Sequence, residues 1–200
     1  GGIGDLERGG RAEALALDTL RAHGIATAGT RMVCSATRTY LLSERFDRLG
    51  ATGRRHVVSV GAAHAGFVAD AYQSWPSTCS QLAAQQQLSK DDAAQAEAVW
   101  HFGRLIGNTD MHSGNLSLFV DRSKLARPRF HVAPIYDMLP MRWRPDMVSG
   151  AADYSAFEPN PFSLQSAARN MAQGFWSGLA ECNAVSNGLR DTAQTMLERS

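Results

Sequence analysis

A short polar loop at residues 107–115 separates two apolar segments of the chain. The segment before it, 98–106, carries apolar side chains at helical spacing, and the segment after it, 116–120, has the pattern of a strand. Glycine at positions 107 and 114 lets the backbone bend there. Because both apolar segments belong to a core, the loop has to turn sharply between them. Such a turn gathers its polar side chains in one place.

The polar residues of this loop are those that phosphoryl transfer needs. Asp110 lies five residues before Asn115, and Asp137 follows on a later segment. In kinase-like enzymes one carboxylate faces the attacking hydroxyl, while an amide and a second carboxylate hold Mg²⁺ on the nucleotide phosphates. Strands at 116–120 and 129–133 would form a hairpin that returns Asp137 to the loop. The residues alone leave open an ordinary surface turn, which uses the same residue types.

Three segments, in the same order along the chain, resemble motifs of the HipA-type toxin kinases. Residues 105–117 are similar to the catalytic loop of that family, and residues 133–140 are similar to its metal-binding segment. Residues 40–48 resemble its strand and hinge, where backbone groups meet adenine. Three motifs in the right order, spread over about half of the chain, are far more specific than any one of them.

The resemblance implies a role for each matching residue. Asp110 would be the catalytic base or the group that orients the hydroxyl, and Asn115 and Asp137 would be the Mg²⁺ ligands. The residues expected along the nucleotide are Glu44, Arg45, Phe46, His112, Ser113, Gly114, Asn115, Tyr136 and Asp137. ATP and Mg²⁺ are the implied cofactors. We therefore expect Asp110, Asn115 and Asp137 to converge on one cleft.

Two departures from the family pattern weaken this expectation. Lysine commonly precedes the metal-binding asparagine in such enzymes, whereas Gly114 stands here. A glycine-rich phosphate loop and a strand-borne lysine should also precede the helix that begins near Arg11, yet no lysine occurs before Lys90. The glycines at 1–10 match a phosphate loop poorly because no strand precedes them. We expect most of the kinase small lobe to be missing from these residues.

The predicted fold is α+β and mainly α. It is a protein-kinase-like large lobe, as in the HipA-like C-terminal domain, with a truncated small lobe. Residues 1–45 would hold the residual small-lobe helix, strands and hinge, and residues 46–200 the helical large lobe with catalytic loop 107–116 and metal-binding segment 133–140. The expected helices span 11–23, 90–106, 163–182 and 187–199, and further strands span 31–34 and 39–43. Residues 54–60 are expected to form a strand or an extended segment. Residues 62–80 have no clear pattern, and 141–161 read as irregular.

Composition limits the cellular setting and the partners. The 20 Lys and Arg residues nearly balance the 19 Asp and Glu residues, which argues against nucleic acid as an obligatory partner. No apolar run approaches the roughly 20 residues of a membrane span, and no secretory signal opens the chain. Cys34, Cys79 and Cys182 are odd in number and far apart, as reduced thiols are. We expect a cytoplasmic protein without a membrane partner.

By resemblance, the function is that of a serine/threonine-type protein kinase, the toxin of a toxin-antitoxin system, which transfers the ATP γ-phosphate to a protein hydroxyl. A protein substrate and an antitoxin protein would be its partners, and nucleic acid would be met only through the antitoxin. Two alternatives stay open: a catalytically inactive kinase-fold module for protein interaction, and a metal-dependent phosphohydrolase or nuclease using Asp110, His112 and Asp137. The triplet 142–144, Arg-Trp-Arg, suits a stacked base or an acidic partner, although such triplets are more often a solvated loop edge.

Overall fold

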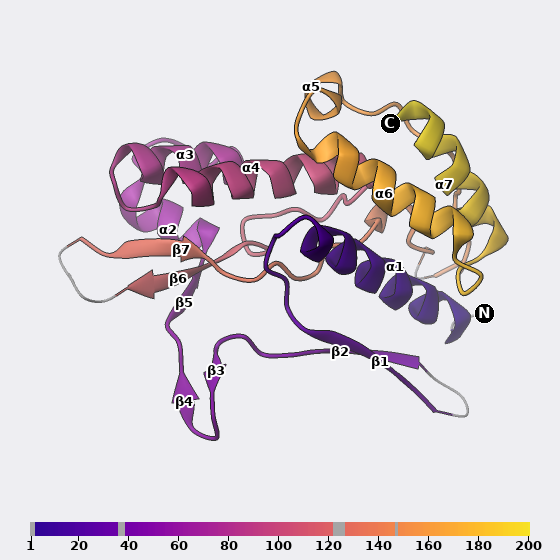
Figure 1. Cartoon of the computed structure of the whole chain (residues 1–200), viewed down its shortest axis with the longest axis horizontal. Coiled ribbons are helices and arrows are strands. Elements are labelled where there is room, and N and C mark those ends of the chain that lie inside the picture. Colours follow the sequence, from indigo (N-terminus) through magenta and orange to yellow (C-terminus); the bar gives the residue numbers. More distant parts are fainter. Residues whose placement is uncertain (1–2, 36–38, 122–126, 147) are drawn as a thin grey trace.

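The computed structural model describes residues 3–35, 39–121, 127–146 and 148–200 as a mixed α+β arrangement that is mainly helical (Figure 1). The helices are α1 (Ile3–Ala22), α2 (Val60–Phe67), α3 (Trp75–Ala84), α4 (Lys90–Leu105), α5 (Pro161–Leu164), α6 (Ala168–Glu181) and α7 (Asn187–Arg199), with a short 3-10 turn, η1 (Met141–Trp143). The strands are β1 (Thr30–Cys34), β2 (Thr39–Ser43), β3 (Arg48–Leu49), β4 (Gly53–Arg54), β5 (Val57–Ser59), β6 (Ser117–Asp121) and β7 (Arg129–Val132).

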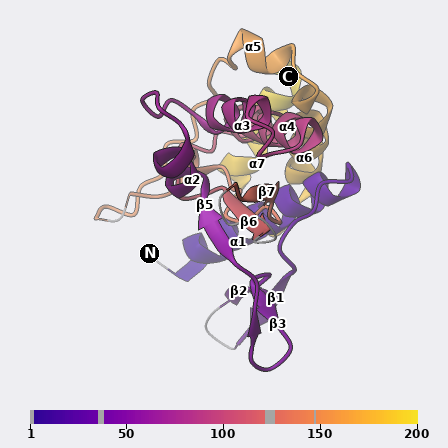
Figure 2. The same ribbon diagram turned by 90° about the vertical axis from the view of Figure 1, so that its left-hand side faces the viewer.

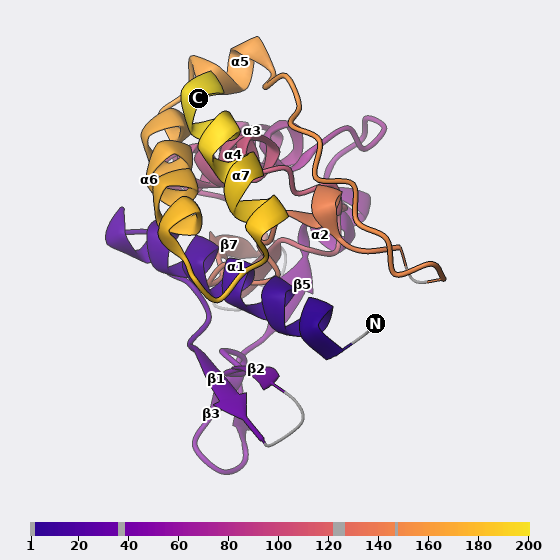
Figure 3. The same cartoon turned by 90° about the vertical axis from the view of Figure 1, so that its right-hand side faces the viewer.

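Helix α4 is the element that organises the large helical part. Its N-terminus is well defined, because the Ser89 hydroxyl accepts the Asp92 backbone N–H at 2.9 Å and acidic residues occupy the positive first turn. Along its buried face, Val99 and Phe102 are fully enclosed, and the Phe102 ring packs edge-on against Phe175 of α6. Figure 3 shows α7 beside α6, with α1 crossing near both. The site is therefore built at the C-terminal end of a rigid helix.

The three-stranded antiparallel sheet β5-β6-β7 lies against this helical layer (Figure 2). Leu118 at its centre faces Val58 on one side and Val132 on the other. The start of α4 fixes the sheet, since Asp92 Oδ1 accepts the Val132 backbone N–H at 3.0 Å. Helix α4 thus holds β7 near its own N-terminus and leads into the predicted catalytic loop at its C-terminus.

Two smaller antiparallel pairs, β1-β2 and β3-β4, lie on the other side of α1 from the helical layer (Figure 1). Helix α1 ends at Ala22, and Gly24 in the turn after it has a φ of +80°, which suits glycine. The chain after it then pairs with the metal-binding segment, because the Ala28 N–H donates to the Ile135 carbonyl at 2.8 Å and Thr27 forms a parallel bridge with Ile135. This contact holds α1 next to the predicted site.

Several of the expected elements are confirmed. The helices predicted over 11–23, 90–106 and 187–199 are α1, α4 and α7, and α1 begins earlier, at Ile3. The strands at 31–34 and 39–43 and the later hairpin are also present. Among the described residues no helix is both long enough and apolar enough to cross a membrane. The division of the chain at residue 45 stays a prediction.

Three local predictions were wrong or incomplete. The helix expected over 163–182 is broken, because the Ser166 hydroxyl donates to the Ser163 carbonyl and accepts the Ala168 N–H, which closes a turn between α5 and α6. The extended segment expected over 54–60 is divided, because Arg54 belongs to β4 and β5 covers only 57–59 before α2, which Ser59 caps. The unassigned stretch 62–80 contains the rest of α2 and most of α3.

Candidate active site

Gly107 turns the chain out of α4 and into the catalytic loop. Its φ is +73°, in the region that favours glycine, as its place in the sequence predicts. A Cβ atom there would lie 2.7 Å from the Trp143 ring. Its carbonyl accepts the Arg142 backbone N–H at 2.9 Å, so η1 and the loop are joined directly. No other residue fits this turn without moving Trp143.

Asn108 is buried and links the two functional segments. Its Oδ1 accepts the Asp110 backbone N–H at 3.0 Å, and its Nδ2 lies 3.5 Å from both the Asp137 carbonyl and the Met138 sulfur. Reasoning from the sequence did not give this residue a role. Asn108 lies within the catalytic-loop motif, but its burial depends on the segment around Asp137 and Met138 and could not be inferred from the local sequence.

The structure brings Asp110, Asn115 and Asp137 together, as the motif spacing predicts. The Asn115 amide Nδ2 donates to the Asp110 carbonyl at 2.8 Å and to Asp137 Oδ2 at 3.0 Å. Asp137 has a φ of +53°, an uncommon value for a residue with a side chain. Hydrogen bonds to the loop therefore hold a strained residue in place, and the constraint falls on the predicted metal ligand.

The electrostatics of this cluster suit a cation. Burial raises the pKa of Asp137, and the negative charge of Asp110 raises it further, against smaller opposing effects of His112 and Asn115. Asn115 Oδ1 accepts no hydrogen bond from any described residue, so an amide oxygen remains for a metal. A divalent cation would relieve the repulsion between the carboxylates, and carboxylate and amide oxygens are ligands that Mg²⁺ accepts.

The protein does not supply a complete metal cage by itself. Among the described residues, no group of three or more His, Cys, Asp or Glu side chains is arranged to hold a metal. Mg²⁺ is commonly bound through one or two carboxylates, with water and substrate phosphates as its other ligands. The donor set here fits that incomplete type of site better than a structural metal centre.

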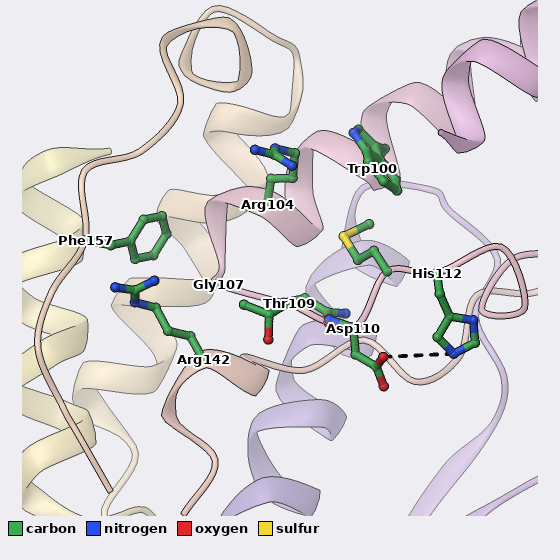
Figure 4. Close-up of a pocket in the computed structure, with 10 residues that line it drawn as sticks. Trp100, Arg104, Gly107, Thr109, Asp110, His112, Arg142 and Phe157 are labelled. Atoms are coloured by element: carbon green, nitrogen blue, oxygen red, sulfur yellow. Dashed lines mark hydrogen bonds and ion pairs between the residues drawn. The ribbon is translucent and has the colours of Figure 1, made fainter. Parts of the chain in front are cut away.

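His112 supports the loop and is not positioned as part of a metal cluster. Its Nδ1 accepts the Gly114 backbone N–H at 2.9 Å, so the neutral ring carries its proton on Nε2. That nitrogen lies 4.0 Å from Asp110 Oδ1, and Figure 4 shows the ring directed toward the carboxylate. The His112 carbonyl accepts the Trp75 indole N–H at 2.9 Å. His112 therefore supports the loop by hydrogen bonding.

The structure gives a reason for glycine at position 114, where the family commonly has lysine. A Cβ atom at this position would lie 2.8 Å from the His112 ring. The Gly114 carbonyl accepts the Tyr136 hydroxyl at 2.9 Å, and Ser117 donates to the same hydroxyl at 2.8 Å. Tyr136 thus fastens the metal-binding segment to the catalytic loop, and burial raises its pKa.

The predicted hinge residues, 44–46, differ in their contacts. Phe46 packs against the Tyr136 ring, with centroids 5.6 Å apart, and edge-on against Phe119. Arg45 turns away and forms two hydrogen bonds with Asp47, at 2.7 and 2.6 Å. Glu44 is exposed, and its backbone N–H donates to a neighbouring carbonyl. Phe46 is thus the predicted hinge residue with a ring contact to the metal-binding segment.

Ser113 lies against the start of α2 through its backbone. Its carbonyl accepts the Gly61 N–H at 3.0 Å, and a Cβ at Gly61 would lie 2.7 Å from the Ser113 hydroxyl. The middle of the catalytic loop is thus pressed onto α2, which itself follows directly from β5. This packing adds a second attachment of the loop, beside the hydrogen bonds of Asn108.

Glu13 of α1 is a site residue that the sequence did not reveal. Burial raises its pKa to about 7, and the nearby Asp137 charge adds to the shift, while the Asp137 backbone N–H donates to the carboxylate and partly offsets it. It forms no ion pair with any described cation. Its closeness to Asp137 makes Glu13 part of the site, and that closeness depends on tertiary packing.

The family of the chain follows from comparison with known proteins. The HipA-like C-terminal domain family matches residues 4–199, and the chain belongs to that family. It is 39% identical over 193 residues to Toxin YjjJ of Escherichia coli (strain K12), a match that covers 94% of this chain and 42% of that protein.

A solved structure has the same fold. In the Shewanella oneidensis MR-1 toxin-antitoxin complex of HipA, HipB and operator DNA, one chain matches with a TM-score of 0.54 and 20% identity. The match covers 96% of this chain and 46% of that one. The chain therefore spans less than half the length of both relatives.

Substitution of Glu13 should change how stability depends on pH. The folded-state pKa of about 7 lies above the ordinary 4.5, so the folded chain binds more protons between these values, and stability falls as the pH rises through that window. Glu13→Gln removes this loss. Urea unfolding should find the variant about 1–3 kcal/mol more stable than wild type at pH 8 and nearly equal to it at pH 4.5. The exposed Glu181→Gln is the control, and a Glu13→Gln variant no more stable at pH 8 would contradict the assignment.

Substitution of Gly114 should release His112. In Gly114→Ala the added Cβ displaces the ring and breaks the Gly114–His112 hydrogen bond. We expect ¹⁵N NMR of the ring to lose its Nε2–H preference, with a stability loss of about 1–2 kcal/mol. Gly66→Ala is a matched control, since a Cβ there meets nothing within 4 Å. Unchanged His112 signals in Gly114→Ala would be inconsistent with this geometry.

Proposed function

We propose that the chain is the phosphotransfer part of a HipA-like toxin of a toxin-antitoxin system. Its activity would be that of a serine/threonine-type protein kinase, which transfers the γ-phosphate of ATP to a protein hydroxyl. The convergence of Asp110, Asn115 and Asp137 is the observation that carries the proposal. Family membership and the likeness to Toxin YjjJ support the toxin assignment.

The chain's own residues would divide the chemistry as follows. The Asp110 carboxylate, which is exposed to solvent, would accept the hydrogen bond of the acceptor hydroxyl, orient its oxygen and take its proton. Asn115 Oδ1 and the Asp137 carboxylate would hold Mg²⁺. When bound, ATP and Mg²⁺ supply the phosphoryl group and neutralise its charge.

Positioning is the main contribution that a protein makes to phosphoryl transfer. Asn108 fixes the backbone of Asp110, and His112 lies beside its carboxylate. Tyr136 bonds to Gly114 and so ties the metal-binding segment to the loop. These hydrogen bonds would keep the base and the metal ligands in register before substrates arrive, which lowers the reorganisation needed during the reaction.

Glu13 supports the kinase assignment and also points to what these residues lack. Protein kinases pair a strand-borne lysine with a helix glutamate near the nucleotide. Glu13 is a half-buried helix glutamate beside Asp137, and no lysine precedes Lys90. We propose that Glu13 pairs with a lysine from a segment outside these 200 residues. Such a cation would stabilise the ionised carboxylate and contact the nucleotide phosphates.

The partners of the whole protein are proposed by analogy. The Shewanella oneidensis structure contains HipA together with HipB and operator DNA. We propose that the protein carrying this chain binds an antitoxin in a similar way and meets nucleic acid through it. The near balance of charge in the chain agrees with an indirect contact with DNA.

A second candidate is an interaction module that keeps the kinase fold without activity. The absence of lysine before Lys90 and at position 114 favours it. Calorimetry with ATP and Mg²⁺ separates the two. We expect weak or absent binding by the 200 residues alone and clear binding by the whole protein. Failure of the whole protein to bind would favour the module, and tight binding by the 200 residues would show that the other parts of the pocket are dispensable.

Asp110→Asn in the whole protein should abolish phosphorylation. The amide keeps the size and polarity of the carboxylate but cannot take a proton, so radiolabelled phosphate transfer should fall by on the order of 10²-fold or more, with nucleotide affinity nearly unchanged. Asp137→Ala should instead weaken binding of Mg²⁺-nucleotide. Asp191→Asn, an exposed change on α7, is the control. Wild-type transfer by Asp110→Asn would refute the role of this loop.

A further inference from the structure

A cavity of about 550 Å³ opens beside the catalytic loop, between the end of α4, η1 and the segment that precedes α5. Its lining includes Trp100, Arg104, Asp110, His112, Arg142 and Phe157 (Figure 4). A space of this size holds a few side chains but not a folded domain. Because Asp110 is part of the wall, whatever enters the cavity meets the proposed base.

The cavity is lined by Asp110 but not by the residues proposed to hold the metal. Neither Asn115 nor Asp137, the proposed Mg²⁺ ligands, belongs to its lining, and Tyr136 does not either. A metal held by Asn115 and Asp137 would therefore lie outside the cavity and leave it open to the acceptor. The acceptor hydroxyl has to approach from a side that the nucleotide leaves open, because the attacking and leaving oxygens are roughly in line.

Two guanidinium groups give this cavity a positive charge. Arg104 and Arg142 are both exposed, and neither pairs with a carboxylate within 4.0 Å among the residues that the structure describes. Figure 4 shows Arg142 next to Phe157, and its guanidinium lies 5.3 Å from that ring centroid. Arg142 is also one of the groups that lower the pKa of Asp153, after the hydrogen bonds from Ser155. Neither guanidinium is held in an ion pair among the described residues, so both can meet an anionic group.

We propose that this cavity is the acceptor subsite, in which Arg104 and Arg142 select a protein segment that carries carboxylate side chains near the hydroxyl oriented by Asp110. The inference rests on the proposed kinase function and adds its substrate class. Guanidinium groups bind carboxylates through paired hydrogen bonds, and the Trp100 and Phe157 rings offer apolar contact to the same segment. Nucleic acid is a poorer fit, because the chain has a net charge of only +1.

Peptide binding without ATP tests the selection independently of catalysis. Two fluorescein-labelled peptides would share a central serine and differ only in having aspartate or asparagine on both sides of it. Fluorescence anisotropy with the whole protein should show the aspartate peptide binding about tenfold more tightly. Arg104→Gln and Arg142→Gln should each reduce this ratio, by about three- to fivefold, as loss of a charge-assisted hydrogen bond predicts.

A matched control and a reversed variant keep the test sharp. Lys90→Gln removes a cation from the other end of α4, about 20 Å away along the helix, and should leave the ratio unchanged. The double variant Arg104→Glu, Arg142→Glu should prefer a third peptide with lysine at the same positions. Thermal unfolding verifies that each variant is folded. Equal binding of the aspartate and asparagine peptides, or an equal effect of Lys90→Gln, would overturn the inference.

Transfer assays separate the inference from the function on which it rests. With ATP and Mg²⁺, wild type should phosphorylate the aspartate peptide with the higher kcat/KM. Transfer at equal kcat/KM to both peptides would overturn the acidic selection and leave the kinase function standing. Arginine-dependent binding of the acidic peptide without transfer to either one would overturn both the kinase function and the acceptor role. A single-stranded oligonucleotide that displaces the peptide at lower concentration would overturn the assignment to protein.

Discussion

The hydrogen bonds of the Asn115 amide are the interaction on which the candidate site depends. A single Nδ2 group donates to the Asp110 carbonyl and to the Asp137 carboxylate, so it joins the catalytic loop to the metal-binding segment. Asn108 and Tyr136 make further links between the same two segments. Because Asp137 has a positive φ, these links must also hold a strained backbone. They hold the Asp137 carboxylate next to the backbone of Asp110.

The rest of the fold brings these two segments into contact. Helix α4 delivers the loop at one end and anchors β7 at the other, where Asp92 accepts the Val132 N–H. Helix α1 places Glu13 beside Asp137. Burial raises the pKa values of Glu13 and Asp137. Repulsion between neighbouring carboxylates raises them further. Cations bound there would relieve that repulsion, which agrees with the chemistry proposed for the site.

Local signals explain what the sequence could predict. Ser89 and the acidic residues after it define the start of α4, and the spacing of Asp110, Asn115 and Asp137 across a hairpin indicates their convergence. The burial of Asn108 and the position of Glu13 could not be predicted, since both depend on segments far away in the chain. The break between α5 and α6 was also not predicted, because it depends on hydrogen bonds of Ser166 that compete with the helix. Nor was the closeness of the His112 ring to Gly114, the position where the family commonly has lysine.

The central claim, that Asn115 and Asp137 hold a metal while Asp110 faces the acceptor, can be tested most directly by locating the metal. A crystal structure of the whole protein with Mn²⁺ in place of Mg²⁺ and a non-hydrolysable ATP analogue would show the ion by its anomalous scattering. We predict a peak within coordination distance of Asn115 Oδ1 and the Asp137 carboxylate, in contact with the phosphates, with the Asp110 carboxylate outside the coordination shell. A peak away from both ligands, with the nucleotide bound elsewhere, would contradict it.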